Sequence, residues 1–355
     1  MYEAATQFLP QGASLSSIEP FGNGNINKTY LAAHSEGSFI LQRINEKVFK
    51  KPALVMQNLV AFAQHVEERL KATADKGRRG WEVPLVVPTV SGADHWVDGE
   101  GGYWRGLTFI EDVETFDTIR DLRHAREVGE ALGMFHCLIS DMPAERLADT
   151  LPGFHITPGY LAQYDEALGT TTAEDTENVL WCKAFVEAHR AEVAVLEEAG
   201  LPLRPIHGDP KVNNILMDLT MGHAVSIVDL DTVKPGLVHY DIGDCLRSGC
   251  NRLGEETKDW KSVTFDLDLC QELLRGYLSE ATFLTDAERE HLFNAVRLIP
   301  FELGLRFFTD HLNGNVYFTA SHATHNLERA LVQFQLAASV EAQEAAIRQI
   351  INEAV

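Results

Sequence analysis

The chain has 355 residues, 45% of them hydrophobic and 23% charged, so it is long enough for one large domain or two lobes and has the composition of a folded protein, which excludes the disordered and fibrous classes. Its net charge of −22 repels nucleic acid and anionic membrane surfaces, and therefore excludes polyanion binding as its main role. An anionic ligand would need bound cations or local basic groups to offset this field.

The cysteines and the N-terminal residues indicate the compartment of the protein. The five cysteines form no C-x-x-C pair and none stands beside a histidine at zinc-ligand spacing, so we expect buried thiols in a reducing cytoplasm. The first residues lack the basic start and apolar core of a signal peptide, and no apolar run approaches the roughly 18 residues of a membrane helix. We expect a cytoplasmic protein with neither a membrane nor a nucleic-acid partner, and the composition fixes no oligomeric state.

The first 111 residues alternate β-like segments with one helix. Ile18 to Tyr30 is typical of two strands joined by a glycine-rich turn, and Ser38 to Ile44 of a third strand. Pro52 to Leu70 keeps its apolar residues on one face, as a packed helix does. Two more strands are predicted at residues 85–90 and 103–110. The pattern predicts a small antiparallel sheet in a first lobe that ends near Glu111.

Beyond Glu111 the pattern changes to long helical segments. They are predicted at residues 122–140, 176–199, 266–279, 285–312 and from 324 to the C-terminus. Only one β-like region, residues 204–233, interrupts them, and it contains a group of polar residues. We therefore predict an α+β fold with a strand-rich N-lobe over residues 1–111, a mainly helical C-lobe over residues 112–355, and a cleft between them.

The polar group within the β-like region has the composition that phosphoryl transfer requires. It is written IHGDPKVNNILMD and then HAVSIVDLDTV, so Asp209 and Asn214 lie five apart on a loop and Asp229 follows a second short strand. Phosphoryl transfer needs a carboxylate that orients or deprotonates the attacking hydroxyl, and oxygen ligands that hold magnesium against the phosphates. Asp209 fits the first role, and Asn214 and Asp229 fit the second. Each alone could be a turn former or cap, but the set at this spacing favours the chemistry.

The same residues carry a resemblance to a known superfamily. The segment H-G-D-x-x-x-x-N followed by I-V-D is similar to the catalytic and metal-binding loops of the aminoglycoside phosphotransferases and choline kinases, which are relatives of the protein kinases. The resemblance implies a two-lobed, protein-kinase-like fold that uses ATP and Mg²⁺. It also implies Asp209 as the catalytic base, Asn214 and Asp229 as magnesium ligands, and Asp231 as an acidic group that supports a second metal.

A narrower resemblance concerns the acceptor of the phosphate. The stretches FGNGNINKTYL, FILQRIN, VDLDTVKPG and ELGLRFFTDHLNGNVYF are similar to the bacterial N-acetylhexosamine 1-kinases. This resemblance implies transfer of phosphate from ATP to the anomeric hydroxyl of N-acetylglucosamine or N-acetylgalactosamine. Within it, Asp209 would contact the sugar that it deprotonates.

The expected nucleotide site combines the glycine-rich turn with the segment that joins the lobes. Glycine lets backbone amides approach phosphates closely, so the turn would cover the ATP phosphates with Gly22, Asn23, Gly24 and Asn25. The turn lacks the G-K-[ST] ending of a P-loop, which disfavours a P-loop kinase. By resemblance, adenine would meet the backbone of the joining segment at Phe109, Ile110 and Glu111.

One position departs from the superfamily pattern. The phosphate-binding lysine of the third strand is replaced by Gln42, and strand alternation sends the neighbouring Arg43 to the opposite face. Two interpretations remain open at this point. Either Gln42 binds phosphate as a neutral ligand while metals supply the charge, or a basic residue reaches in from elsewhere.

The acceptor side rests on the helix from Phe301 to Leu312, which carries Glu302, Arg306 and Asp310 four apart on one face. This spacing fits a polar sugar pocket or an ordinary salt-bridge ladder. The resemblance assigns Arg306 and Asp310 to the sugar, with Tyr317 as a stacking partner, and it makes outer candidates of His325, Asn326 and Arg329. His207 is expected to support the catalytic loop by hydrogen bonding.

Two alternatives compete with a sugar kinase. The first is a related kinase of another small alcohol such as homoserine, choline, ethanolamine or an aminoglycoside; choline would require an aromatic cage and an aminoglycoside an acidic pocket. The second is a pseudokinase that binds nucleotide without transferring phosphate, for which the missing lysine is the argument. The presence of Asp209, Asn214 and Asp229 together favours catalysis.

Overall fold

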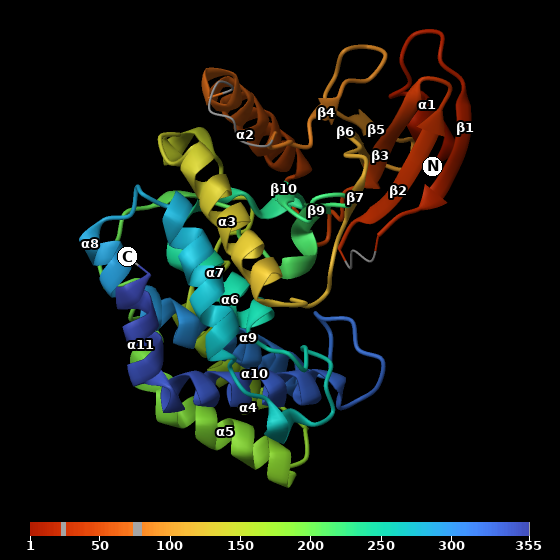
Figure 1. Cartoon of the computed structure of the whole chain (residues 1–355). Coiled ribbons are helices and arrows are strands. Elements are labelled where there is room, and N and C mark those ends of the chain that lie inside the picture. Colours follow the sequence, from red (N-terminus) through yellow and green to blue (C-terminus); the bar gives the residue numbers. More distant parts are fainter. Residues whose placement is uncertain (23–25, 74–79, 355) are drawn as a thin grey trace.

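The N-terminal part of the molecule is an antiparallel sheet preceded by a short helix (Figure 1). The computed structural model describes residues 1–22, 26–73 and 80–354. Five strands follow the order β1-β2-β3-β6-β4 and β5 pairs with β6. The elements are α1 (Tyr2–Thr6), β1 (Leu15–Pro20), β2 (Lys28–His34), β3 (Gly37–Arg43), β4 (Val86–Val87), β5 (Trp96–Val97) and β6 (Tyr103–Thr108).

This sheet has a small core of its own. Phe39 and Leu41 alternate on β3 with less buried residues and pack with Phe8 and Trp104. A side chain at Gly106 on β6 would press on the Phe8 ring, since its Cβ would lie 3.0 Å from that ring. Glycine at this position lets the segment that follows α1 lie directly on the sheet.

Helix α2 (Pro52–Thr73) belongs to the N-terminal part in sequence but packs on the C-terminal part. Its buried residues Leu59 and Phe62 join the larger core, and the Phe62 ring lies 5.3 Å from that of Phe135. The buried Asn58 amide donates to the carbonyls of Ala148 and Val233 at 2.8 Å. The boundary between two lobes at residue 111 remains a prediction, because α2 precedes this residue in the chain but packs on the C-terminal part.

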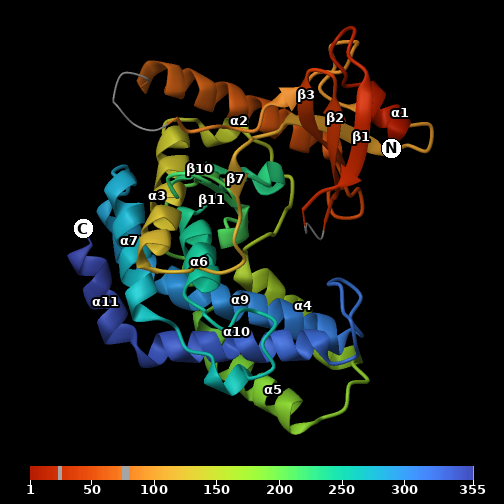
Figure 2. The same cartoon turned by 45° about the vertical axis from the view of Figure 1, so that its right-hand side comes forward.

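The C-terminal part is a group of helices around α9, with α3 and α7 packed side by side (Figures 1 and 2). A Cβ at Gly129 would collide with the Leu273 carbonyl and one at Gly276 with the Arg126 carbonyl, so these glycines allow α3 and α7 to touch through their backbones. The helices are α3 (Leu122–Ile139), α4 (Thr157–Thr170), α5 (Glu177–His189), α6 (Val238–Gly249), α7 (Leu267–Glu280), α8 (Asp286–Glu290), α9 (Leu292–Leu312), α10 (His325–Ala342) and α11 (Glu344–Glu353).

Two small sheets lie between the N-terminal sheet and helix α6 (Figure 2). They account for the β-like region predicted at residues 204–233. One consists of β7 (Val113–Glu114), β9 (Ile215–Asp218) and β10 (Ala224–Ile227), and the other of β8 (Arg204–Ile206) and β11 (Lys234–Gly236). Short 3₁₀ turns occur at Ala144–Arg146, Arg190–Glu192, Val212–Asn214, Leu230–Thr232 and Trp260–Ser262.

The helix predictions differ from the structure where polar residues interrupt an apolar pattern. The segment 122–140 is α3 to within a residue, whereas 285–312 breaks at His291, the long C-terminal segment breaks at Gln343, and 176–199 leaves the α-helical form after His189. Helices α4 and α6 were not predicted. Helix α6 has an apolar stripe through Val238, Ile242 and Leu246, but it also buries His239, Asp241 and Asp244 and directly follows the β-like region, so its residues were not assigned to a helix. In the part of the chain that the structure describes, every helix is too short or too polar to cross a membrane.

Candidate active site

The loop that carries Asp209 is held by a buried carboxylate from a distant helix. Asp241 on α6 accepts the backbone N–H groups of His207 at 2.6 Å and Gly208 at 2.8 Å, and the Nε2 of His136 at 2.8 Å. Burial opposes its charge, but the hydrogen bond from His136 and the charge of that ring hold the pKa of Asp241 below its ordinary value. Gly208 adopts a φ of 89°, and a Cβ there would lie 2.8 Å from the Thr232 carbonyl, so only glycine fits.

His207 supports the loop as expected. Its Nε2 donates to the Val228 carbonyl at 3.0 Å, and its Nδ1 accepts the N–H of Asp209 at 3.2 Å. Burial lowers the pKa of His207, so the ring is neutral with its proton on Nε2. The ring thereby joins the loop before Asp209 to the end of strand β10, where Asp229 follows.

Asp209 and Asn214 lie at the two ends of this loop and are linked to each other. The Asn214 side-chain amide donates to the Asp209 carbonyl at 2.8 Å, which turns its Oδ1 away from that contact. The half-buried Asp209 carboxylate pairs with Lys211 Nζ at 2.8 Å, and this carboxylate raises the pKa of Lys211. Lys211 was not among the predicted site residues, although a basic side chain two positions after Asp209 was a readable signal.

Asp229 is the carboxylate of the site that has no hydrogen-bond or ion-pair partner among the described residues. It follows β10 in the left-handed conformation, with φ 66° and ψ 54°, which aspartate tolerates better than most residues. Among the described residues, none donates a hydrogen bond to its carboxylate. The residue is exposed at the surface of the chain, but the protein packed around its carboxylate, followed by the charges of Asp231 and Asp209, raises the pKa of Asp229 to about 7.

These groups fit a divalent cation with oxygen ligands. Asp229 offers a carboxylate whose negative neighbours are only partly compensated, and Asn214 offers an amide oxygen that accepts no hydrogen bond from the described residues. Within residues 1–22, 26–73 and 80–354, no three His, Cys, Asp or Glu side chains form a complete protein cage for a metal. Mg²⁺ in phosphoryl transfer commonly takes one or two protein ligands together with phosphate and water, so the pair Asn214 and Asp229 has the right size.

Asp231, two residues further on, has a contrasting environment. Its side chain is 3% exposed; one oxygen accepts from Asn27 Nδ2 at 2.5 Å and the other pairs with Arg105 at 2.5 Å. Oδ2 therefore accepts a hydrogen bond from the N-terminal part, whereas Oδ1 forms an ion pair with Arg105 and has no hydrogen-bond partner among the described residues. The predicted support of a second metal by Asp231 would have to act through these contacts.

Gln42 is also fully engaged. Its Oε1 accepts from Nε and Nη2 of Arg105 at 2.9 and 2.6 Å, and its Nε2 donates to Thr29 Oγ1 at 3.0 Å. Arg105 is the residue directly opposite Gln42 in the β3–β6 pairing. A basic residue thus lies beside Gln42 on the neighbouring strand, and both interpretations left open by the sequence remain predictions about phosphate binding.

The residues predicted to contact ATP lie where the N-terminal sheet joins the rest of the chain. Phe109, Ile110 and Glu111 follow β6, with Ile110 buried and the Phe109 ring 5.6 Å from that of Phe21 in an edge-on contact. Gly22 has a φ of 71°, as a tight turn requires. The other predicted turn residues, Asn23, Gly24 and Asn25, lie outside the described residues. These nucleotide contacts remain predictions.

Arg306 on α9 is enclosed by aromatic rings. Its guanidinium carbon lies 5.2 Å from the Phe154 ring, 5.0 Å from Tyr160 and 5.5 Å from Phe318. No carboxylate in the described part of the chain lies within ion-pair distance of it. Burial opposes its charge, but electrostatic interactions with Tyr160, Glu302 and more distant groups that include Asp209 raise the pKa of Arg306, so the side chain remains a cation.

Glu302, one helical turn before Arg306, connects α9 to the catalytic loop. It accepts His155 Nδ1 at 2.9 Å and Thr157 Oγ1 at 2.9 Å, while His155 Nε2 reaches the Gly208 carbonyl at 2.8 Å. Both partners of His155 are acceptors, so the ring carries two protons. Burial disfavours that charge, but Glu302 raises the pKa of His155 above its ordinary value. Glu302 and Arg306 do not pair, which contradicts the salt-bridge ladder.

Asp310 holds the loop that carries Tyr317. Its carboxylate accepts the backbone N–H groups of Val316, Tyr317 and Phe318 at 2.8–2.9 Å, together with Asn326 Nδ2 at 2.9 Å. Asp310 is 4% exposed and Tyr317 64% exposed. The hydrogen bonds of the Asp310 carboxylate thus go to the loop that presents Tyr317 and to Asn326 on α10, and its direct contact with a substrate remains a prediction.

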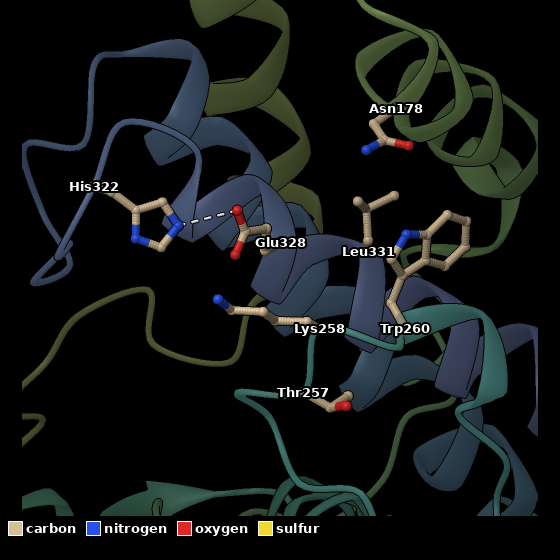
Figure 3. Close-up of a pocket in the computed structure, with 7 residues that line it drawn as sticks. All are labelled: Asn178, Thr257, Lys258, Trp260, His322, Glu328 and Leu331. Carbon is tan, nitrogen blue, oxygen red and sulfur yellow. Dashed lines mark hydrogen bonds and ion pairs between the residues drawn. The ribbon is translucent and has the colours of Figure 1, made fainter.

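The outer candidates stabilise the same region. His325 contacts Glu256 at 2.6 Å, and Arg329 contacts Glu256 and the Thr319 carbonyl. A separate open hollow of about 510 Å³ is lined by none of the predicted catalytic, metal or substrate residues (Figure 3). Its lining residues are Asn178, Thr257, Lys258, Trp260, His322, Glu328 and Leu331.

The antiparallel sheet, the helical part and the Asp209 loop between them together define a protein-kinase-like phosphotransferase fold, as predicted. Residues 17–280 match the model of the phosphotransferase enzyme family, and the chain belongs to that family. This result confirms the predicted superfamily.

Solved structures with low sequence identity share the fold. An aminoglycoside phosphotransferase from Alicyclobacillus acidocaldarius superposes with a TM-score of 0.65 at 16% identity, covering 97% of each chain. A microcompartment-associated aminopropanol kinase gives 0.60 at 18% identity over 96% of this chain and 95% of its own. A choline/ethanolamine kinase family protein from Mesorhizobium loti gives 0.53 at 16% identity over 94% and 93%.

Proposed function

We propose that this phosphotransferase is a kinase that uses ATP and Mg²⁺ to phosphorylate a hydroxyl group of a small neutral molecule, with the anomeric hydroxyl of an N-acetylhexosamine as the first candidate. Family membership supports phosphoryl transfer. The observation that carries the acceptor class is the unpaired, aromatic-walled Arg306, whose pKa Asp209 helps to raise. The resemblance to the sugar 1-kinases supports the particular acceptor.

Asp209 is the proposed base of the reaction. Its carboxylate is anchored by Lys211 and its backbone by Asn214, so it can accept the proton of an acceptor hydroxyl in a fixed position. The hydroxyl oxygen forms a bond to the γ-phosphorus while the bond to the ADP oxygen breaks, and the proton passes to Asp209. A magnesium ion held by Asn214 and Asp229 would neutralise phosphate charge during this transfer.

Arg306 favours a neutral acceptor over the cationic ones. A choline, ethanolamine or aminoglycoside cation would be repelled by a guanidinium that no carboxylate among the described residues contacts directly. The rings that could form a cage for a quaternary ammonium already enclose Arg306 itself. The oxygens of a sugar or of its acetamido group, in contrast, can accept hydrogen bonds from the guanidinium, and the exposed Tyr317 ring offers a stacking surface.

A panel assay tests this proposal. The protein is incubated with ATP, Mg²⁺ and single acceptors, namely N-acetylglucosamine, N-acetylgalactosamine, glucose, homoserine, choline, ethanolamine, aminopropanol and an aminoglycoside, and ADP release is measured. Turnover with an N-acetylhexosamine is expected, and Asp209→Asn should reduce it by about a hundredfold or more while ATP still binds. Turnover with amines alone would overturn the acceptor assignment.

A binding measurement covers the pseudokinase alternative. If ATP binds in the presence of Mg²⁺ but no acceptor releases ADP, the protein binds nucleotide without catalysis and the proposed reaction is wrong.

Arg306→Ala is the matched variant on the acceptor side of the site. It should raise the KM for the sugar about tenfold or more and leave the KM for ATP unchanged, because the guanidinium is assigned to the acceptor.

A further inference from the structure

We propose that Arg105 performs the work of the missing third-strand lysine: it fixes the Asp229–Asp231 segment to the N-terminal sheet and supplies the positive charge beside which the ATP phosphates bind. Gln42 holds Arg105 in place for this role. The inference rests on the proposed function in that it presumes ATP as the ligand. It assigns Arg105 as a positioning residue.

The register of the sheet brings the two side chains together. Gln42 on β3 and Arg105 on β6 are directly opposite each other in an antiparallel pair, so their side chains extend from the same face of the sheet. The Gln42 amide oxygen receives two N–H groups of the guanidinium, at 2.9 and 2.6 Å. A cation from β6 therefore occupies the region that a lysine at position 42 would reach.

Because Arg105 is buried, its charge requires a partner, and the position of that partner shows which segment Arg105 holds. Arg105 is 1% exposed, and a buried guanidinium is retained only where its charge is compensated. The partner is Asp231, at 2.5 Å, whose other oxygen accepts from Asn27 near the glycine-rich turn. Asn27 in turn accepts the backbone N–H of Asn45 at 2.9 Å. Asp231 thus connects the segment after β10 to Arg105 on β6 and to Asn27, and Arg105 extends this connection to Gln42 on β3.

Arg105 also has a hydrogen-bond donor group that no described residue uses. Its Nη1 is buried and has no hydrogen-bond partner among the described residues. Its charge acts on Asp229, as does that of Lys211, although neither contacts that carboxylate. A guanidinium that neutralises one buried acid and acts on a second, with one donor group free, suits a site that must accept additional negative charge from phosphates.

Substitutions that move the positive charge from one strand of the pair to the other test the inference. The variants are Arg105→Gln, Gln42→Lys and the double variant that carries both changes, which moves a single cation from β6 to β3. The affinity for ATP with Mg²⁺ is measured by calorimetry without acceptor. Arg105→Gln should weaken binding by about ten- to a hundredfold, since a charge-assisted contact is lost. The double variant should recover most of that loss.

Matched controls separate the charge from a general effect on folding. Arg43→Gln removes the neighbouring arginine, whose guanidinium lies over the Trp104 ring at 5.9 Å on the other face of the sheet, and should leave ATP affinity unchanged. Arg105→Lys keeps the charge but not the paired contacts to Gln42, and should fall between wild type and Arg105→Gln. Far-ultraviolet circular dichroism and the melting temperature establish that each variant is folded. If Arg105→Gln does not fold, the double variant carries the test.

The outcomes distinguish this inference from the proposed function. Unchanged ATP affinity in folded Arg105→Gln would overturn the inference. If Arg105→Gln does not fold, a folded double variant that binds ATP about tenfold or more weakly than wild type would overturn it. Wild-type protein that binds ATP but transfers no phosphate would overturn the proposed function and leave the role of Arg105 standing. Wild-type protein that binds no ATP would overturn both.

Discussion

Asp241 and Asp310 perform the same task in two different regions of the molecule. Each is a buried carboxylate that gathers backbone N–H groups of a loop and so leaves a residue of that loop free to act: Asp241 serves the Asp209 loop, and Asp310 serves the Tyr317 loop. The first loop is enclosed by protein, whereas Val316 and Tyr317 are 77% and 64% exposed. The same device therefore gives a rigid catalytic loop and an open loop that can meet different acceptors.

The largest effect is expected from Asp241→Asn. The amide keeps the shape but loses the charge that holds the His207 and Gly208 N–H groups and His136. We expect the free energy of unfolding to fall by about 3 kcal/mol and turnover to be lost, because buried donors lose their acceptor. Urea unfolding and ADP release measure the two effects. Glu290→Gln, an exposed acid on α8, is the control and should change neither.

Proton competition at Asp229 should give the next largest effect. Because the pKa of Asp229 is raised to about 7, the carboxyl is neutral below that pH and must lose its proton to bind a cation. Mg²⁺-dependent binding of ATP should therefore weaken about tenfold for each pH unit below 7 and level off above it. Titration calorimetry from pH 5.5 to 8.5 measures the slope. The slope should disappear in Asp229→Asn, and its persistence there would assign the proton to another group.

Asp310→Asn should affect the open loop alone. An amide cannot accept hydrogen bonds at its nitrogen, so part of the contacts to Val316, Tyr317, Phe318 and Asn326 is lost and the loop loses its fixed shape. The KM for the acceptor should rise about tenfold while the KM for ATP stays unchanged. An equal rise of the KM for the acceptor and the KM for ATP would show that the Tyr317 loop and the nucleotide site do not respond independently.

The smallest effect concerns His155, which bridges the two regions. Its folded-state pKa is raised above the ordinary value by Glu302, so its stabilising contribution is fully present below the unfolded pKa and is lost as pH rises through the folded pKa. Stability should therefore decline with rising pH above neutrality. In His155→Gln this decline should be shallower. Urea unfolding of both proteins from pH 5.5 to 9 measures the difference, and parallel profiles would contradict it.

The sequence predicted those parts of the site whose residues are neighbours in the chain. Asp209, Asn214 and Asp229 lie on two short loops after strands, and their spacing alone indicated the chemistry. Their supports are distant: Asp241 contacts His207 across 34 positions, and Glu302 contacts His155 across 147. No local pattern connects such residues.

In the acceptor region, too, sequence spacing alone could not show which side chains are available to a ligand. The spacing of Glu302, Arg306 and Asp310 correctly placed them on one helix, but each has different neighbours, and only Arg306 remains without a hydrogen-bond or ion-pair partner within the described residues. Which of three polar residues on a helix stays available depends on what packs around them. That information lies in the tertiary contacts.

The pairing of β3 with β6 has a consequence for how such enzymes are classified. Surveys that require a lysine at the third-strand position would record Gln42 and sort this chain among inactive relatives. A cation supplied from the adjacent strand, 63 positions along the chain, escapes any linear pattern. Surveys that compare positions across paired strands would keep such chains among the candidate enzymes and would direct assays to proteins that a one-dimensional filter discards.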